Sequence, residues 1–267
     1  MCLKKKRMAL FLVAICSMIL PLTVSAKKNV TMDKYLKKGK QYQILAYNNH
    51  RDARVNIWKR KGSYKDKYGS LGYGDAIVVN RSKLKKGKSI KWLPVYLHNR
   101  KSGKSYATGY VAIKKVKIAT IYSKQYSKNK IIDKAIKTGM KYLGTPFAFG
   151  NNSLTAGIDC SNFVNTCYAI GGKRLSYPHT DSLQVVSYDV SSKKLKAGDL
   201  IFYRDNDDDP PRRGTGPIGH VSMYIGKGFV IHASGHYGST YPAGGICIKR
   251  IDYGRRVAAR YMRPYGI

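Results

Sequence analysis

The stretch GIDCSNF at residues 157–163 begins a predicted helix and places a cysteine in its first turn. One side of this helix follows the spacing i, i+3, i+4, i+7 and i+8: Cys160, Phe163, Val164, Cys167 and Tyr168. Asp159 is suited to cap the N-terminus of the helix, and Gly171-Gly172 to end it. Because the helix dipole favours a thiolate at this end, Cys160 is a candidate nucleophile.

A predicted β-hairpin lies sixty residues further along the chain. Residues 220–225 and 229–233 are apolar and strand-like, and the turn residues Gly226-Lys227-Gly228 separate them. A further strand is expected over residues 198–203, just before the hairpin. Each strand of the hairpin carries one histidine, and these are the candidate bases for a cysteine nucleophile.

The length of the hairpin loop decides which faces the two histidines occupy. With three residues in the loop, Ile225 lies opposite Phe229, and His220 and His232 then share one face as diagonal neighbours. A two-residue loop would instead turn them to opposite faces of the sheet. On the three-residue reading, His220 is the base for Cys160, and His232 orients its ring.

The first residues of the chain predict export. Lys4-Lys5-Lys6-Arg7 precede an apolar run over residues 8–22, and Val24-Ser25-Ala26 supplies small residues for a cleavage site. We therefore expect a signal peptide over residues 1–26. The alternative is an uncleaved membrane anchor, for which the apolar run is short. The expected location is secreted, with no stable membrane insertion after cleavage.

Composition excludes several classes of enzyme and points to an anionic partner. All 14 acidic residues are Asp, so neither a His-Glu-x-x-His zinc peptidase nor a Glu general acid is possible. Residues 27–122 contain 25 Lys and Arg against 4 Asp, a net charge of +21, and residues 123–267 contain 21 against 10, a net of +11. For an exported protein this charge predicts contact with anionic cell-wall polymers rather than nucleic acid. A generally basic proteome would explain part of the excess.

Two domains are expected after the signal peptide. Residues 27–122 contain short apolar runs separated by glycines, which predict a small all-β barrel or sandwich: 42–47, 53–58, 76–79, 92–97 and 108–113. The runs Arg54–Ile57 and Thr108–Ile113 loosely resemble the first and last strands of bacterial SH3-like wall-binding modules, although an unrelated β-rich spacer stays possible. Residues 119–128 are expected to form a polar connector, and an amphipathic helix over 129–143 belongs to the second domain, 123–267.

Five segments of the second domain resemble the NlpC-type cell-wall cysteine peptidases, in order and spacing: LGTPFAFG at 143–150, Asp159-Cys160-Ser161, GDLIF at 198–202, Gly219-His220-Val221 and Ile231-His232-Ala233. The resemblance covers residues 129–264, about half of the chain. It implies an α+β papain-like fold with an antiparallel sheet packed on helices. It also implies a secreted endopeptidase that cleaves amide bonds of peptidoglycan stem peptides, next to D-Glu or D-isoGln, through a thioester.

The resemblance also implies roles for particular residues. Cys160 matches the nucleophile, His220 the base and His232 the third member of a Cys-His-His triad. Asp159 and Ser161 match positions that hold the free amine of a stem peptide in some members. The chain departs from the family pattern at four positions, which puts substrate recognition in doubt: Phe147 for Tyr, Asn151 and Asn162 for Gly, and His179 for Arg.

Two other functions stay open from the sequence. The same triad could serve an amidase or a transpeptidase acting on wall peptides, or the chain could be a wall-binding surface protein with a drifted catalytic site. No cofactor or metal is expected. The spacing of His232 and His236 could bind a metal on a helix, but Gly235 and the strand-like pattern around it argue against a helix there. A loop of four acidic residues is either solvated or attracts cationic stem residues: Asp205, Asp207, Asp208 and Asp209.

Overall fold

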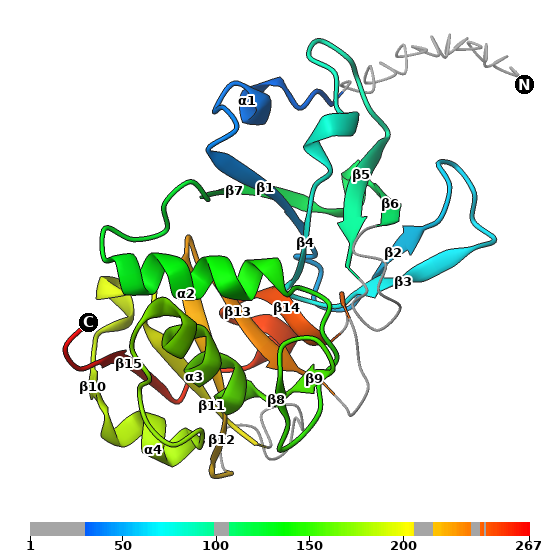
Figure 1. Cartoon of the computed structure of the whole chain (residues 1–267). Coiled ribbons are helices and arrows are strands. Elements are labelled where there is room, and N and C mark those ends of the chain that lie inside the picture. Colours follow the sequence, from blue (N-terminus) through cyan, green and yellow to red (C-terminus); the bar gives the residue numbers. More distant parts are fainter. Residues whose placement is uncertain (1–29, 99–106, 206–215, 236–240, 243) are drawn as a thin grey trace, which may run out of the picture.

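The computed structural model describes residues 30–98, 107–205, 216–235, 241–242 and 244–267 (Figure 1). The predicted signal peptide therefore lies outside the described residues. The largest element is a nine-stranded antiparallel sheet, in the order β10 (Ser187–Asp189), β15 (Arg260–Pro264), β11 (Leu200–Arg204), β12 (Ile218–Gly226), β13 (Phe229–Ser234), β14 (Gly245–Arg250), β4 (Asp75–Val78), β1 (Tyr42–Tyr47) and β7 (Lys117–Tyr122). A second sheet contains β3 (Lys67–Leu71), β2 (Val55–Trp58), β6 (Ala107–Ala112) and β5 (Trp92–Leu97), and a third contains β8 (Asn152–Ser153) and β9 (Gly157–Ile158).

Both long helices begin within one residue of the predicted start, but the first ends at Lys141, two residues before the predicted end. The side chain of Asn129 accepts hydrogen bonds from two backbone N–H groups at the start of α2 (Lys130–Lys141). Asp159 caps α3 (Cys160–Gly171) in the same way, and Gly172 ends it in the left-handed conformation that glycine adopts without strain. Two shorter helices, α1 (Asp33–Leu36) and α4 (Thr180–Val185), were not predicted. None of the helices in the described part of the chain has the length and apolar character needed to cross a membrane.

Helices α2 and α3 pack against each other and cover one face of β12 and β13 (Figure 1). A small residue makes their close approach possible: a Cβ added at Gly139 of α2 would lie 2.9 Å from the ring of Phe163 in α3. Phe163 is fully buried and belongs to the main core. The opposite face of the sheet carries a smaller apolar cluster of Ile201, Tyr203, Val230 and Tyr253. Strands at the centre of the sheet are therefore buried on both faces.

The N-terminal half is joined to this sheet by strand pairing. Strand β4 pairs with β14 through Ala76–Ile248 and Asp75–Lys249, and β1 lies between β4 and β7. An isolated bridge between Val79 and Val95 connects these strands to the second sheet. The strands of residues 27–122 are thus divided between two sheets, one of which continues into the C-terminal half. The boundary predicted at residue 122 stays a prediction.

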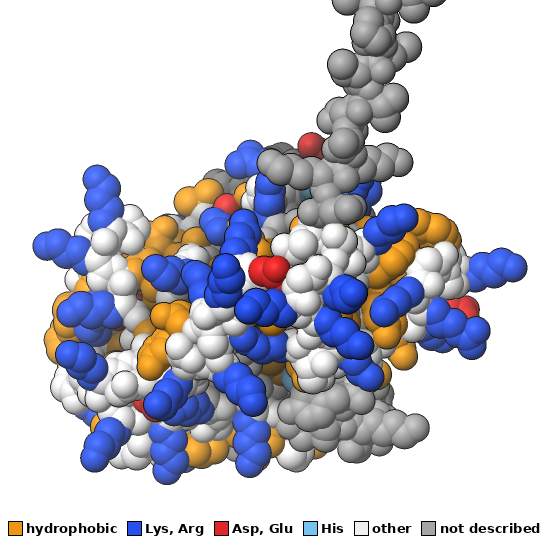
Figure 2. All heavy atoms as spheres, turned by 90° about the horizontal axis from the view of Figure 1, so that it is seen from above, with side chains coloured by type: hydrophobic (Ala, Val, Ile, Leu, Met, Phe, Trp, Pro, Cys, Tyr) orange, Lys and Arg blue, Asp and Glu red, His pale blue; other side chains and the backbone are white. Residues whose placement is uncertain are grey.

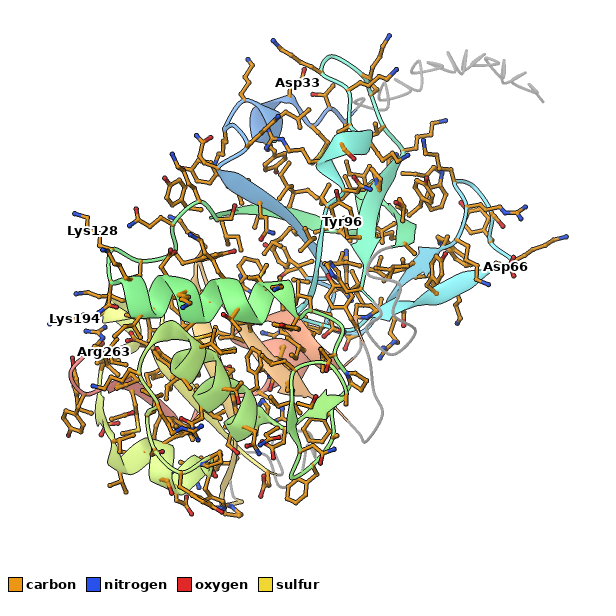
Figure 3. The ribbon with its side chains drawn as sticks, in the orientation of Figure 1. Asp33, Asp66, Tyr96, Lys128, Lys194 and Arg263 are labelled. Atoms are coloured by element: carbon orange, nitrogen blue, oxygen red, sulfur yellow. The ribbon has the colours of Figure 1, made fainter. Side chains whose placement is uncertain are left out.

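Side chains from both halves line the junction between them. Tyr96 of β5 lies above α2 in Figure 3, and with His98 and Met140 it lines a cavity of about 310 Å³.

The polar connector expected over 119–128 is wrong in its first part, because residues 119–122 belong to β7. Ile121 of this strand is 1% exposed, so its burial against β1 outweighs the polar character of the residues that follow.

Replacing Phe163 by Ala should lower the free energy of unfolding by roughly 3–5 kcal/mol, because the ring is fully buried between α2 and the sheet. Ile170→Ala in the same helix is the control. Ile170 is 40% exposed, so its loss should change stability by no more than about 0.5 kcal/mol. Urea unfolding of the two variants measures the difference. Equal losses would mean that α3 does not pack as described.

Candidate active site

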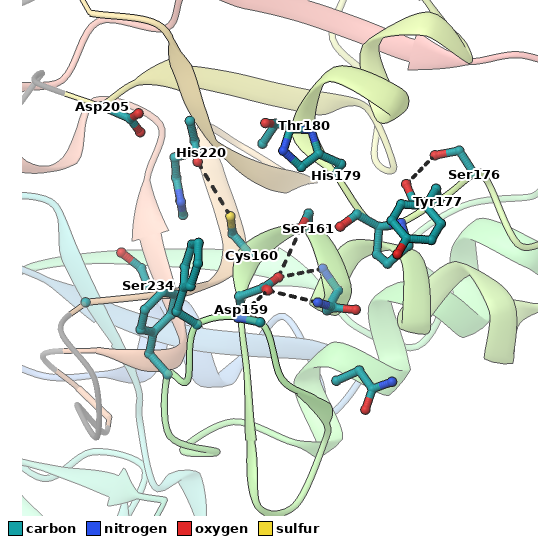
Figure 4. A pocket seen from close by; sticks show the side chains of 18 of the residues that line it. Asp159, Cys160, Ser161, Ser176, Tyr177, His179, Thr180, Asp205, His220 and Ser234 are labelled. Carbon is teal, nitrogen blue, oxygen red and sulfur yellow. Dashed lines mark hydrogen bonds between the residues drawn. The ribbon is translucent and has the colours of Figure 1, made fainter.

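A pocket of about 990 Å³ opens at the N-terminus of α3. Cys160 and His220 both line it, and Figure 4 shows the thiol and the imidazole next to each other. His232 lies behind His220 and is fully buried. The structure therefore brings together the three residues that the sequence predicts as a triad. Their catalytic roles stay a prediction.

Cys160 is held as a neutral thiol. It is the first residue of α3, is 9% exposed, and its Sγ donates a long hydrogen bond to the carbonyl oxygen of Gly219, at 3.9 Å. Burial raises the pKa of Cys160 to about 11, and the backbone N–H of Val221 only partly offsets this. The backbone N–H groups of Cys160 and Ser161 at the start of the helix also lower this pKa, in the direction that the helix dipole predicts, but burial outweighs them. Desolvation of a sulfur anion costs more than the helix N-terminus returns.

The two histidines share a face because a β-bulge corrects the hairpin register. Met223 pairs with Ile231, in agreement with the predicted register. Nearer the turn, however, Phe229 pairs with Gly226 and not with Ile225. The turn therefore contains only two residues, and the three-residue loop was wrong. One extra residue, Ile225, is inserted between the paired positions of β12. This insertion restores the parity that a two-residue turn would otherwise reverse.

A hydrogen bond of 2.7 Å joins Nε2 of His220 to Nδ1 of His232. This leaves Nδ1 of His220 as the ring nitrogen that can accept the thiol proton. Burial, together with the cations of Arg256 and Lys249, lowers the pKa of His220 to about 3. Burial likewise holds the pKa of His232 well below its usual range. Both imidazoles are therefore neutral near pH 7, and His220 is in the form that accepts a proton.

Asp159 and Ser161 lie next to Cys160, but the carboxylate of Asp159 already accepts from three N–H groups and has the Ser161 hydroxyl within hydrogen-bond distance. Its Oδ1 accepts from the backbone N–H of Asn162 at 2.8 Å and lies 3.1 Å from the Ser161 hydroxyl. Its Oδ2 accepts from the Asn162 side-chain amide at 2.8 Å and from the Gly150 N–H at 3.0 Å. The Ser161 hydroxyl also lies 2.9 Å from the carbonyl of Pro178. The pair therefore builds the helix N-terminus, and its substrate-binding role stays a prediction.

Other residues of the pocket could not be identified from the sequence. Phe149 and Tyr177 line it and are 84% and 80% exposed, which is unusual for aromatic side chains. Arg174 and Arg256 add positive charge. Three residues that depart from the family pattern also line it: Phe147, Asn162 and His179. No local signal marks the exposed aromatic residues, because loops bring them to the pocket.

The acidic loop and the metal expectation are only partly covered by the described residues. Asp205 lines the pocket, whereas Asp207, Asp208 and Asp209 lie outside the described residues. His236 lies outside them too. Within the residues that the structure describes, no cluster of three or more His, Cys or Asp side chains could hold a metal ion. Cys160, Cys167 and Cys247 are free and buried.

The buried imidazole of His232 should make the protein less stable in acid. Below about pH 6.5 the unfolded chain binds a proton on this ring and the folded protein does not, so protonation favours unfolding. Between pH 7.5 and pH 5 this contributes a loss of about 2 kcal/mol. His232→Gln removes the contribution, so its unfolding free energy should fall less over the same range. Parallel pH dependences in urea unfolding would show that His232 titrates normally when folded.

Comparison with known proteins agrees with this geometry. Residues 144–251 match the NlpC/P60 family. The chain is 35% identical over 102 residues to a gamma-D-glutamyl-L-lysine dipeptidyl-peptidase of Bacillus cereus, covering 38% of this chain and 28% of that protein. It is 34% identical over 112 residues to the peptidoglycan DL-endopeptidase CwlO of Bacillus licheniformis, covering 38% and 22%. The chain thus spans less than a third of the length of these relatives.

A solved structure of an NlpC/P60 family protein from Bacillus cereus is similar at 21% identity and a TM-score of 0.42, covering 88% of this chain and 67% of that one. The family match spans the segment from the end of α2 to β14 and includes Cys160, His220 and His232. Over residues 144–251 the chain is therefore similar to the NlpC/P60 family.

Proposed function

We propose that this protein is a secreted cysteine endopeptidase that cleaves peptide bonds in the stem peptides of peptidoglycan. One observation carries the proposal: a thiol at a helix N-terminus shares a pocket with an imidazole whose far nitrogen is hydrogen-bonded to a second, buried imidazole. Such an arrangement supplies a nucleophile, a base and an orienting group. The names of the matched relatives, a dipeptidyl-peptidase and a peptidoglycan DL-endopeptidase, give the substrate class.

Because both residues are neutral, the proposed mechanism begins with a proton transfer. Nδ1 of His220 takes the proton of the Cys160 thiol as the sulfur attacks the scissile carbonyl. The backbone N–H of Cys160 has no carbonyl partner within its own helix, so it can donate to the oxyanion. The His220 imidazolium then protonates the leaving amine. Water activated by His220 hydrolyses the thioester and restores the thiol, while His232 holds the ring throughout.

The pocket favours cleavage within a chain over removal of an N-terminal dipeptide. A dipeptidyl-peptidase must recognise the free ammonium group of its substrate, which calls for a carboxylate with unused acceptor positions. The carboxylate beside Cys160 is that of Asp159. Three N–H groups donate to it, and the Ser161 hydroxyl lies 3.1 Å from its Oδ1. Asn162 contributes both a backbone and a side-chain donor. We therefore place the activity with endopeptidases, acting on stem peptides still attached to glycan.

The N-terminal half is proposed to bind the wall as an SH3-like module. Figure 2 shows Lys and Arg side chains spread over the face that includes this half, with few acidic ones between them. Residues 27–122 carry a net charge of +21. Several of the lysines lie over tyrosine rings, including Lys59 over Tyr68 and Lys61 over Tyr110. A surface of cations and aromatic planes suits phosphate-rich wall polymers. Secretion through a signal peptide over residues 1–26 belongs to the same proposal.

Incubating residues 27–267 with peptidoglycan sacculi, and with the free stem peptides, tests the activity. The parent protein should release stem-peptide fragments from sacculi, detected by mass, and Cys160→Ala should reduce release by at least about a thousandfold. Cys167→Ala is the matched control, because Cys167 is a buried cysteine of the same helix that lines no part of the pocket.

The products separate the alternatives. Preferential cleavage of free stem peptides would favour a dipeptidyl-peptidase, and joined peptides would favour a transpeptidase. Loss of the stem peptide from its sugar would identify an amidase. No release by the folded parent protein would make the chain a wall-binding protein without peptidase activity.

Binding to the wall should depend strongly on salt. Because the attraction acts between exposed charges, it is screened over about 10 Å at 0.1 M ionic strength and over about 3 Å at 1 M. Retention of Cys160→Ala on sacculi should therefore fall at least tenfold between these conditions. Sacculi stripped of their phosphate polymers are the control and should retain less protein at low salt. Retention that is independent of salt would rule out the polyanion as the main ligand.

A further inference from the structure

An aromatic wall stands behind the two histidines. The ring of Tyr253 packs edge-on against His232, with centroids 4.9 Å apart, and against Tyr203, with centroids 5.4 Å apart. The ring of Tyr203 lies 5.8 Å from that of His220. Tyr203 is fully buried and Tyr253 is 4% exposed. The two tyrosines therefore limit how far either imidazole can move away from the thiol.

The contact with Tyr253 is important for the orientation of His232, because only one of the two ring nitrogens of His232 has a hydrogen-bond partner among the described residues. Its Nδ1 is bonded to His220, whereas its Nε2 is buried and has no hydrogen-bond partner among the described residues. A carboxylate or carbonyl bonded at Nε2 would fix the ring directly. Here the ring is positioned by its contact with Tyr253.

The segment that carries Tyr253 is held in turn by the N-terminal half. The backbone N–H of Arg250 donates to the carbonyl of Gly74 at 2.7 Å, and that of Gly254 donates to the carbonyl of Tyr73 at 3.0 Å. The hydroxyl of Tyr73 donates to Asp252 at 2.9 Å. Three hydrogen bonds between the turn before β4 and this segment thus hold the residues on both sides of Tyr253.

Gly74 allows the two backbones to touch. Its φ is +82°, and a Cβ added there would lie 2.5 Å from the Cα of Tyr253. Next to it, Asp75 forms an ion pair of 3.1 Å with Lys249, and both side chains are about nine-tenths buried. Lys249 Nζ lies over the Tyr253 ring, 4.9 Å from its centroid. Burial alone would lower the pKa of Lys249, but the carboxylate of Asp75 outweighs this and raises it.

We propose that the turn Gly72–Asp75 is a positioning element of the active site, which holds Tyr253 against His232 and so aligns His220 with Cys160. The inference rests on the proposed function. It gives the N-terminal half a part in turnover that is separate from binding the wall. Asp75 and Gly74 are positioning residues in this scheme, because neither touches the reacting atoms.

Gly74→Ala in the full chain, compared with Gly62→Ala, tests the contact. Both glycines have positive φ, +82° and +70°, so both substitutions strain the backbone. Only the Cβ at position 74 meets Tyr253, because nothing lies within 4 Å of a Cβ at position 62. On a soluble stem peptide, Gly74→Ala should lower kcat about tenfold to a hundredfold with KM nearly unchanged. Gly62→Ala should keep kcat within about twofold of the parent.

The imidazole ¹⁵N resonances give a readout that does not need turnover. Gly74→Ala should shift the signals of His220 and His232, and Gly62→Ala should leave them in place. Shifts without any peptidase activity in the parent would overturn the proposed function and keep the positioning role. Unchanged shifts and unchanged kcat in folded Gly74→Ala would overturn the positioning role alone.

A second variant guards against a folding defect at position 74. Replacing the buried pair together, as Asp75→Leu with Lys249→Met, keeps the packing volume and removes both charges. The charged and titratable groups around the imidazoles are then Cys160, Tyr203, Asp205, Tyr253 and Arg256. Because the cation of Lys249 lowers the pKa of both histidines, the acid limb of kcat/KM should move to higher pH. A purely structural pair would leave this limb where it is.

Discussion

The bulge at Ile225 is the constraint on which the active site depends. Side chains alternate between the two faces of a sheet, so one residue more or fewer in the hairpin would place His220 and His232 on opposite faces. Their 2.7 Å hydrogen bond would then be impossible. Their neighbours Val221 and Ile231 face the core under the helices, whereas the two histidines face Tyr203 and Tyr253, and Cys160 meets His220 in the pocket at the N-terminus of α3.

The chemistry of the pocket follows from burial more than from charge. The protein carries a formal charge of +36, yet the thiol is protonated and both imidazoles are neutral, because desolvation disfavours every charged form. In the proposed mechanism the Cys–His pair therefore transfers a proton during attack and does not start from a preformed thiolate. The cations of Lys249 and Arg256 add to this by disfavouring the imidazolium.

Local features of the fold could be predicted from the sequence, and distant contacts could not. Asp159 and Gly172 cap a helix by their own backbone and side-chain chemistry, and strands such as β1 and β5 show apolar runs. The pairing of β4 with β14 joins residues about 170 positions apart and has no local signature. For the same reason Tyr253 could not be identified, since its neighbours come from both halves. The hydrogen-bonded histidines were predicted with the right faces but the wrong loop.

The single sheet that runs through both halves also determines when the chain can finish folding. During synthesis β4 is made about 170 residues before its partner β14, which corresponds to roughly 10–30 seconds at 5–20 residues per second. Throughout that interval one edge of the N-terminal strands has no partner and could pair with another nascent chain. The net charge of +21 on residues 27–122 would make such copies repel one another. The same lysines could therefore protect an unfinished sheet from aggregation before they meet any ligand.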